Sequence, residues 1–283
     1  MAMNKTVNVE AVRSDGLSFN YNKGDWGMLK LEGIDFPEIE IFAEPRGFGN
    51  GDIITGRRKH GKIIELTARV RMINESLRQE VVGFHNANYE YDLYITYNGI
   101  TRIAKDCFLK AASYPSINVH KKPNLTLLYQ SPHADLFADN ADITSFVSTL
   151  PMWHDTRIYM PNGRLAFGEI KNVNEKIINY LGSEPASLVV TVKATGYVPG
   201  IDIAIDDKKT SIKTTLSSGD TLIIDCGERL VTKNGIPVPV ADYDAWELME
   251  MLLNYGDNLV KVSKNSNTAF TAEISFVGRY GGL

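Results

Sequence analysis

Cysteine, histidine, basic charge and long apolar runs are all scarce in this chain of 283 residues. The two cysteines, Cys107 and Cys226, lie far apart and form no CxxC pair, so we favour two buried free thiols over a disulfide bridge. No two histidines lie three to five residues apart, which excludes an HExxH-type metal pair. We therefore predict no metal and no cofactor.

The charge balance is slightly acidic, with a formal net charge of -4. Without a basic excess to hold a phosphate backbone, nucleic acid is a poor candidate for a tightly bound partner. No apolar stretch reaches the roughly 18 residues of a membrane span, so we expect no membrane partner. The segment Met1–Thr6 has no apolar run like that of a signal peptide. We expect the chain to be made and folded in a cytoplasm.

The usual signatures of an active site are missing as well. There is no GxSxG elbow, and the glycine loop Arg46–Asp52 has no GK[ST] and is followed by a strand pattern. We therefore interpret it as a flexible or tight loop rather than a phosphate cradle. Paired carboxylates could run glycoside hydrolysis, but acidic residues in β turns are usually solvated. The candidates are Asp202, Asp206, Asp207 and Asp225. We predict no catalytic residues and a protein that is not an enzyme.

The chain does contain aromatic residues that could contact a ligand. Trp153 and Tyr159 lie near the start of the second half, and exposed aromatics there could stack on sugar rings. Packing in a core or an interface is the favoured role, since aromatics dominate both.

The dominant hydrophobic period is two, as in half-buried antiparallel strands. Apolar residues alternate with charged ones over 63–72, a segment that includes Arg69 and Arg71. Asn98-Gly99 supplies the positive φ angles of a type I′ turn, which predicts a hairpin over 91–105. The register expected from that turn pairs Tyr97 with Ile100, Thr96 with Thr101, Tyr94 with Ile103, and Asp92 with Lys105. Which face of the hairpin is buried stays open.

Helical spacing occurs in two short segments only. Asn74 can cap a helix whose stripe is Leu77, Val81 and Phe84. A second short helix is possible over 244–253, where Trp246 keeps helical spacing with Met249 and Leu253.

The second half again contains many short strands. Alternation over 188–193 and 270–276 and a second Asn-Gly turn at Asn234-Gly235 indicate a β-sandwich or jelly roll. Pro237 follows that turn and predicts that the strand containing it lies at a sheet edge. A Pro- and Asn-rich stretch over 113–132 precedes this half, so we expect domains 1–134 and 135–283.

The order of these segments resembles the distal tail protein family of siphophages and related prophages. The segments that carry the resemblance are Leu31–Glu40, the glycine loop Gly47–Gly51, Ile54–Arg58, the 63–72 strand, the 74–85 helix, the 91–105 hairpin and Tyr129–His133 in the first half, then Ile178–Pro185, Ser218–Asp225, Asn234-Gly235 and Tyr255–Leu259. Two departures are His133, where an aromatic is usual, and the longer stretch Tyr243–Leu253.

The resemblance implies a mostly β fold, in which 1–134 is a β-sandwich-like, ring-forming domain with one short helix. It implies for 135–283 a jelly-roll domain similar to galectins or carbohydrate-binding modules. The implied function is a structural subunit of a phage or prophage tail tip, a homo-hexameric ring that connects the tail tube protein to the tail-tip hub. Receptor-binding proteins are further implied partners, and DNA would pass the channel without specific binding. The implied location is the virion tail tip, after assembly in the bacterial host cytoplasm. The alternative is a carbohydrate-binding host-adsorption module.

For the ring contacts we consider the apolar residues Trp26, Met28 and Leu29 and the strand 63–72 as candidates, although most of them are expected in the core.

Overall fold

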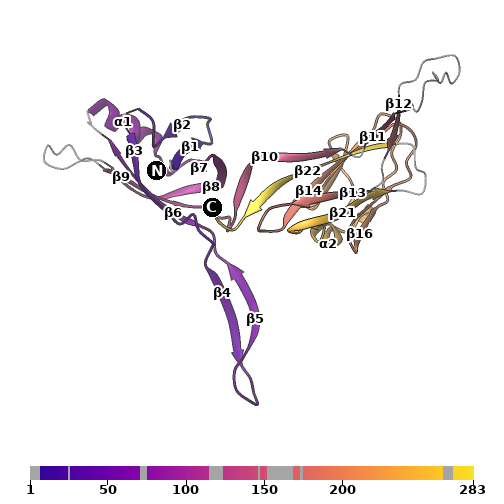
Figure 1. Cartoon of the computed structure of the whole chain (residues 1–283), viewed down its shortest axis with the longest axis horizontal. Coiled ribbons are helices and arrows are strands. Elements are labelled where there is room, and N and C mark those ends of the chain that lie inside the picture. The colour runs from indigo at the N-terminus through magenta and orange to yellow at the C-terminus, as the bar shows by residue number, and fades with distance from the viewer. Residues whose placement is uncertain are drawn as a thin grey trace. The chain divides into compact units, whose positions relative to one another are not determined.

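The computed structural model describes residues 7–24, 26–70, 75–114, 124–145, 147–151, 168–172, 175–263 and 270–283, the side chains of 147–151 and 168–172 excepted. The fold is mostly β and antiparallel, as predicted (Figure 1). The chain forms two compact units. The first comprises residues 1–139 together with 279–283, and the second comprises 140–278.

The first unit is built on one continuous set of paired strands with a helix. In spatial order its strands are β3 (Trp26–Glu32), β6 (Ile63–Val70), β9 (Asn124–Gln130), β8 (Ile100–Ser113), β7 (Glu90–Tyr97), β1 (Val7–Arg13) and β2 (Ser18–Asn20), and α1 (Glu75–Phe84) is its helix. A separate two-stranded sheet consists of β4 (Ile39–Pro45) and β5 (Asp52–Lys59).

The long strand β8 makes this unit sandwich-like. Its residues as far as Phe108 pair with β7, and those from Phe108 to Ser113 pair with β9. Asp106, just before this change of partner, has a positive φ of 53°. Apolar residues from the two halves therefore face one core. Leu93 and Ile95 of β7 belong to it together with Leu66 of β6 and Leu127 of β9.

The predicted hairpin at Asn98-Gly99 is present in β7 and β8, with both φ angles positive. Its register is confirmed from Tyr97–Ile100 to Tyr94–Ile103, and the hydroxyls of Thr96 and Thr101 lie 3.0 Å apart. The expected pairing of Asp92 with Lys105 is wrong, because a bulge shifts the register between Tyr91 and Leu93. There Asp92 instead accepts a hydrogen bond from the backbone N–H of Asp106 at 3.1 Å.

The first predicted helix is confirmed as α1, and Val81 and Phe84 of its stripe are buried. Asn74, the expected cap, lies outside the described residues. The free-thiol prediction is also confirmed, since Cys107 and Cys226 are both free and buried.

The last residues of the chain return to the first unit. Arg279 donates a hydrogen bond to the carboxylate of Asp135 at 2.7 Å, and Lys62 donates one to the carbonyl of Gly281 at 2.7 Å. The backbone N–H of Leu283 donates to the carbonyl of Ile34 at 3.2 Å. The sequence-based division at 134 assigned residues 279–283 to the second domain, whereas in the structure they are part of the first unit. β10 (Leu136–Ser145) and β22 (Phe270–Tyr280) each continue from one unit into the other.

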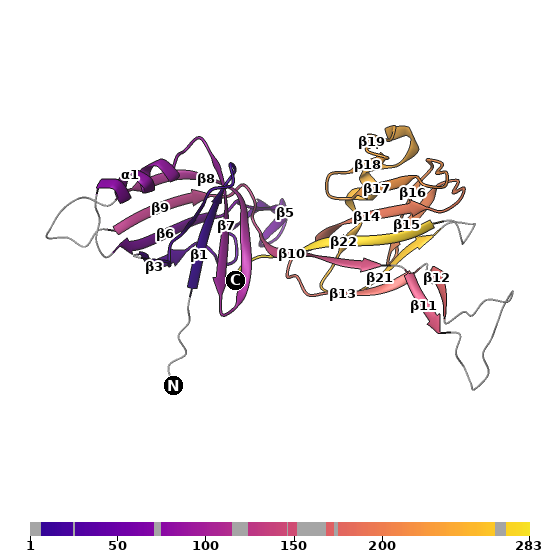
Figure 2. The same ribbon diagram turned by 90° about the horizontal axis from the view of Figure 1, so that it is seen from above.

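The second unit is a β-sandwich (Figure 2). One of its sheets contains, in spatial order, β19 (Ile236–Pro237), β18 (Leu230–Lys233), β17 (Thr221–Asp225), β14 (Ala186–Ala194) and β22, with β20 (Leu252–Leu253) beside β14. The other contains β13 (Glu175–Tyr180), β21 (Gly256–Ser263), β15 (Ile201–Ile205) and β16 (Lys208–Ile212). The short strands β11 (Val147–Pro151) and β12 (Gly168–Asn172) pair with each other.

Alternating residues of both sheets fill the core of this unit, among them Val190 of β14, Ile274 of β22 and Ile203 of β15. The Asn234-Gly235 turn joins β18 to β19, the outermost strand of its sheet, so Pro237 lies at an edge as predicted. Between β19 and β20 lie a 3-10 helix, η2 (Val240–Asp242), and the short helix α2 (Ala245–Met249).

Candidate functional site: an apolar hairpin and a strand edge

The hairpin of β4 and β5 projects from the first unit without a sheet to support it (Figure 1). Its strands pair only with each other among the described residues, in a register that runs from Ile39–Lys59 to Pro45–Asp52. An isolated two-stranded hairpin is marginally stable in water, because it has no layer against which to bury side chains. A hairpin of this kind is therefore typical of a segment that a partner covers.

Apolar side chains are exposed along the whole hairpin. They are Ile39, Ile41 and Phe42 on β4, Phe48 in the loop, and Ile53 and Ile54 on β5. The Phe48 side chain is 99% exposed. Six large apolar side chains exposed on one hairpin are typical of a segment that takes part in an interaction.

The glycine loop forms the tip of this hairpin. The N–H of Arg46 donates to the carbonyl of Gly51 at 3.2 Å, and Gly49 and Gly51 both have positive φ. The glycines are therefore needed to close a tight turn, which is the interpretation that the sequence favoured over a phosphate cradle.

The hairpin carries charges of both signs. Glu40 and Glu44 lie on β4, while Asp52, Arg57, Arg58 and Lys59 lie on β5. Glu40 stands opposite Arg58 in the register and also pairs with His60, whose Nε2 lies 3.2 Å from the carboxylate. The exposed apolar side chains of the hairpin are thus interspersed with charges of both signs, which a partner of complementary charge could match.

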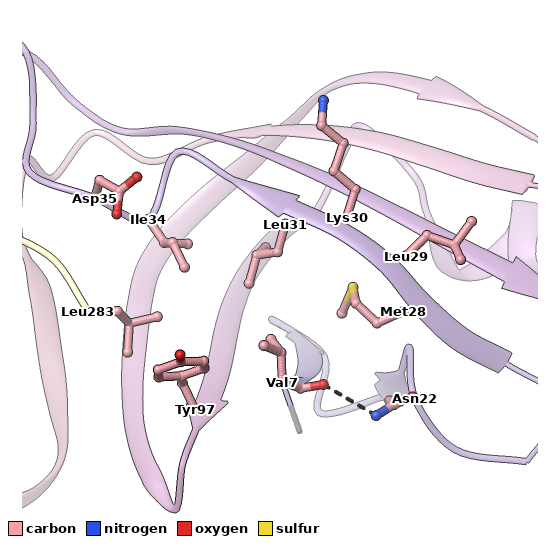
Figure 3. A pocket seen from close by; sticks show the side chains of 10 residues that line it. All are labelled: Val7, Asn22, Met28, Leu29, Lys30, Leu31, Ile34, Asp35, Tyr97 and Leu283. Carbon is pink, nitrogen blue, oxygen red and sulfur yellow. Dashed lines mark hydrogen bonds between the residues drawn. The ribbon is translucent and has the colours of Figure 1, made fainter. Parts of the chain in front are cut away.

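A second candidate surface follows the outer edge of β3. This strand pairs with β6 on one side and with no other strand that the structure describes. A hollow of about 670 Å³ lies beside it (Figure 3). Its apolar lining is Val7, Met28, Leu29, Leu31, Ile34, Tyr97 and Leu283, with Asn22, Lys30 and Asp35 as its polar members. In Figure 3, Ile34, Leu283 and Tyr97 approach one another across the same opening.

An edge strand beside an apolar hollow can accept another chain. Unpaired backbone groups along β3 supply hydrogen bonds, and the hollow supplies room for side chains. The register of β3 shifts between Met28 and Lys30, so Leu29 is bulged out and exposed. Lys30 is held by Glu32 at 2.8 Å and Glu65 at 3.1 Å, which raises the pKa of its ammonium.

The predicted contact residues divide between core and surface. Trp26 packs against the core beside Phe19, with ring centroids 5.5 Å apart. Met28 and Leu29 line the hollow. The described part of strand 63–72 is β6, an interior strand between β3 and β9, so its edge is not open. Arg71 lies outside the described residues.

The four carboxylates considered for catalysis have separate surroundings. Asp202 pairs with Lys209 at 3.1 Å, and Asp206 accepts the N–H of Leu259 at 2.9 Å. Asp225 accepts two backbone N–H groups of the turn after β17. Asp207 is an exposed turn residue. Trp153 and Tyr159 lie outside the described residues.

In the described part of the chain, no group of three or more His, Cys, Asp and Glu side chains is arranged to hold a metal ion. Among those same residues, no helix has both the length and the apolar character to cross a membrane.

The hairpin is the feature that sequence reasoning missed. The signal was present: two apolar segments, 39–42 and 53–54, flank a loop bounded by Pro45 and rich in glycine, which is typical of a hairpin. The sequence does not show that both faces of the hairpin are exposed, because exposure depends on whether another part of the fold packs against them.

Comparison with known proteins identifies a family model that part of the chain matches. Residues 181–280 match the family model described as siphovirus-type tail component, C-terminal domain. No curated protein matches the chain.

Solved structures share the fold over nearly the whole chain. The SPP1 Dit (gp 19.1) protein, described as a paradigm of hub adsorption apparatus in Gram-positive infecting phages, aligns with a TM-score of 0.65 at 11% identity, over 96% of this chain and 98% of that one. Chains of the phage P2 baseplate in its activated conformation, with Ca and with Sr, align at 9% and 10% identity over 98% of this chain and 100% of theirs, with TM-scores of 0.49 and 0.46. Of these three structures, the SPP1 protein has the TM-score that supports a common fold.

The matched family model describes a tail component of siphoviruses, and the SPP1 protein belongs to a phage adsorption apparatus. The resemblance to the phage distal tail protein family is confirmed, in the fold over nearly the whole chain and in the sequence over residues 181–280.

Proposed function

We propose that this chain is the subunit of a ring that connects a phage tail tube to the tail-tip hub. The single observation that carries the proposal is the β4–β5 hairpin, whose apolar side chains are exposed and whose strands pair with no other strand that the structure describes. Burying one Ile or Phe side chain is worth about 1.5–3 kcal/mol, so a neighbour that covers several of them gains a stable contact.

A ring further requires two different patches on each copy. Ring closure uses heterologous interfaces, in which one patch meets another on the next subunit. The hairpin and the β3 edge with its hollow are two such patches on the first unit. We infer that the hairpin of one copy packs along the β3 edge of the next, which assigns the ring contacts to residues 1–139 with 279–283.

The proposed partners follow from the proposed position of the ring between the tail tube and the tail tip. They are further copies of this chain, six in the ring that the family implies, the tail tube protein, the hub protein and receptor-binding proteins. DNA passes through the ring without specific binding, because an acidic subunit offers no counterion release to hold it. The proposed role is structural, without catalysis, at the virion tail tip after assembly in the host cytoplasm.

Light scattering coupled to size-exclusion chromatography tests the proposal on the full chain. The expected result is a closed oligomer of the chain alone or, if the chain alone is monomeric, after addition of the hub protein. A monomer that stays monomeric and unbound with both the hub and the tube protein present would contradict it.

A further inference from the structure

Four asparagines of this chain are followed directly by glycine. They are Asn50, Asn98, Asn162 and Asn234, of which Asn162 lies outside the described residues. An Asn-Gly pair is chemically labile, because glycine has no side chain to keep its backbone nitrogen away from the side chain of the asparagine. The three described pairs share this local chemistry but have different surroundings, so the fold determines which of them reacts.

The reaction of such a pair is the loss of the side-chain amide. The backbone nitrogen of the glycine attacks Cγ of the asparagine, the new C–N bond closes a succinimide ring, and the side-chain nitrogen leaves as ammonia. Water then opens the ring. Opening at the side-chain carbonyl gives aspartate, and opening at the backbone carbonyl gives isoaspartate, whose main chain runs through Cβ. One water is consumed and one ammonia is released without a change of oxidation state, so the solvent supplies all that the reaction needs.

Asn234 is held at both ends of its side-chain amide. Its Oδ1 accepts the backbone N–H of Thr221 at 2.9 Å, and its Nδ2 donates to the carboxylate of Asp220 at 2.8 Å. The backbone N–H of Asn234 also donates to the carbonyl of Thr221 at 2.8 Å. To react, the side chain must give up both of its hydrogen bonds while the turn rearranges, so we expect this pair to be the slowest of the three.

Asn98 is restrained by its backbone. Asn98 and Gly99 have φ angles of 51° and 83° and form a two-residue turn that the pairing of Tyr97 with Ile100 closes. The first central residue of a type I′ turn has a ψ of about 30°, which directs the nitrogen of the following glycine away from Cγ. Closure of the succinimide therefore requires that the turn between β7 and β8 be broken first.

Asn50 has neither restraint. It lies in the exposed loop 46–51 at the tip of the β4–β5 hairpin (Figure 1). Glycines precede and follow it, and its own φ is not positive. Within the described part of the chain its side chain makes no hydrogen bond, and the bond across the loop from the N–H of Arg46 uses the carbonyl of Gly51 rather than its nitrogen. Rotation can therefore bring the Gly51 nitrogen to Cγ of Asn50 without separating paired strands.

We propose that Asn50 is a site of spontaneous deamidation in the folded chain, and that the fold protects Asn98 and Asn234 from the same reaction. The product, aspartate or isoaspartate, adds a negative charge close to Asp52 at the tip of the hairpin. The inference goes beyond the proposed function and does not depend on ring formation, since it concerns the isolated chain.

Incubation of the full chain at pH 8 and 37 °C, with peptide mapping by mass spectrometry at intervals over two weeks, tests the inference. Asn50 is expected to deamidate at least tenfold faster than Asn98 and Asn234. The same chain unfolded in guanidinium chloride is the control, in which the three pairs should react at similar rates. Asn50→Gln keeps an amide but would need a larger ring to react, so this variant should lose the fast phase of ammonia release and melt as the parent does.

Two results would overturn the inference. One is a rate at Asn50 no greater than the rate at Asn98 or Asn234 in the folded chain. The other is an Asn50 that stays intact while the unfolded control reacts. Circular dichroism during the incubation verifies that the folded sample remains folded, so that a reaction at Asn98 or Asn234 is not the result of unfolding.

Discussion

The ammonium of Lys62, which is buried to 3% exposure, donates a hydrogen bond of 2.7 Å to the carbonyl of Gly281, 219 residues further along the chain. It also donates to the carbonyl of Asp35. One buried cation thus holds the start of the hairpin segment and the chain end together. The first unit is completed only when the chain has passed through the second unit and returned.

Lys62→Met should destabilise the first unit. The substitution removes the donor for two carbonyls, and an unsatisfied buried acceptor costs about 1–3 kcal/mol. Urea unfolding, with hydrogen exchange to localise the effect, measures it. Lys23→Met is the matched control, because Lys23 is an exposed turn residue. Equal stability of Lys62→Met and the parent would show that the contact does not stabilise the chain end.

Residues 279–283 should stabilise a fragment of the first unit. We expect residues 1–139 joined through a short Gly-Ser linker to 279–283 to melt at a higher temperature than residues 1–139 alone, because the linked form restores the Arg279–Asp135 and Lys62–Gly281 bonds. Residues 140–278 should melt cooperatively alone with a β-type circular dichroism spectrum. Identical melting of the two first-unit fragments would contradict the role given to the chain end.

The stability of the first unit should fall in mild acid because of His85. Burial lowers the pKa of this histidine to about 4, with a further contribution from Arg13. Between pH 6.5 and 4 the unfolded chain binds a proton at His85 that the folded chain does not, so the free energy of unfolding decreases as pH falls, by on the order of 3 kcal/mol. Below pH 4 both states are protonated and this contribution levels off.

Urea midpoints at pH 7, 5.5 and 4.5 measure the effect. His85→Gln should flatten the dependence, because no titrating ring remains beside Val81 and Tyr21, its hydrogen-bond partners at 2.7 and 2.8 Å. His133→Gln is the control for the removal of a histidine as such, since this ring is partly exposed and contacts Asp106. If the urea midpoints of the parent and of His85→Gln depend on pH in the same way, groups other than His85 cause the acid sensitivity.

Exposed hairpin residues should matter for assembly and little for folding. Ile41→Ser and Ile54→Ser change side chains that are exposed in the subunit, so the free energy of unfolding should change by about 0.5 kcal/mol or less. Assembly should weaken about tenfold or more for each, since each apolar side chain is worth about 1.5–3 kcal/mol when a neighbour buries it. Analytical ultracentrifugation measures the association. Glu44→Ser, on the same hairpin, serves as the control, and equal weakening by all three variants would count against an apolar contact.

Local patterns in the sequence predicted those parts of the fold that local chemistry determines. The Asn98-Gly99 turn set the register of its hairpin because a type I′ turn leaves few alternatives. The same reasoning failed at Asp92, where Asp106 adopts a positive φ that its sequence does not indicate. Arg279 contacts Asp135, a residue far from it in sequence, and the hydrophobic periodicity of the chain does not predict such a contact.

The candidate surfaces were harder to predict than the strands. Met28 and Leu29 were recognised as apolar, but their place at an open edge depends on β3 having one neighbour rather than two. Trp246 was assigned helical spacing, and spacing alone does not distinguish a tryptophan that faces a core from one that is exposed, as this side chain is to 72%. Both distinctions require the neighbouring elements, which only the folded chain provides.

Negative-stain imaging of three samples tests the central claim most directly, that the first unit forms the ring. The samples are the full chain, the first-unit fragment of residues 1–139 linked to 279–283, and residues 140–278, each imaged alone and with the tail-tip hub protein. The account predicts closed rings from the full chain that persist in the first-unit fragment and are lost when residues 39–59 are replaced by a short turn. Rings formed by residues 140–278 alone, or rings of the full chain that survive removal of the hairpin, would contradict it.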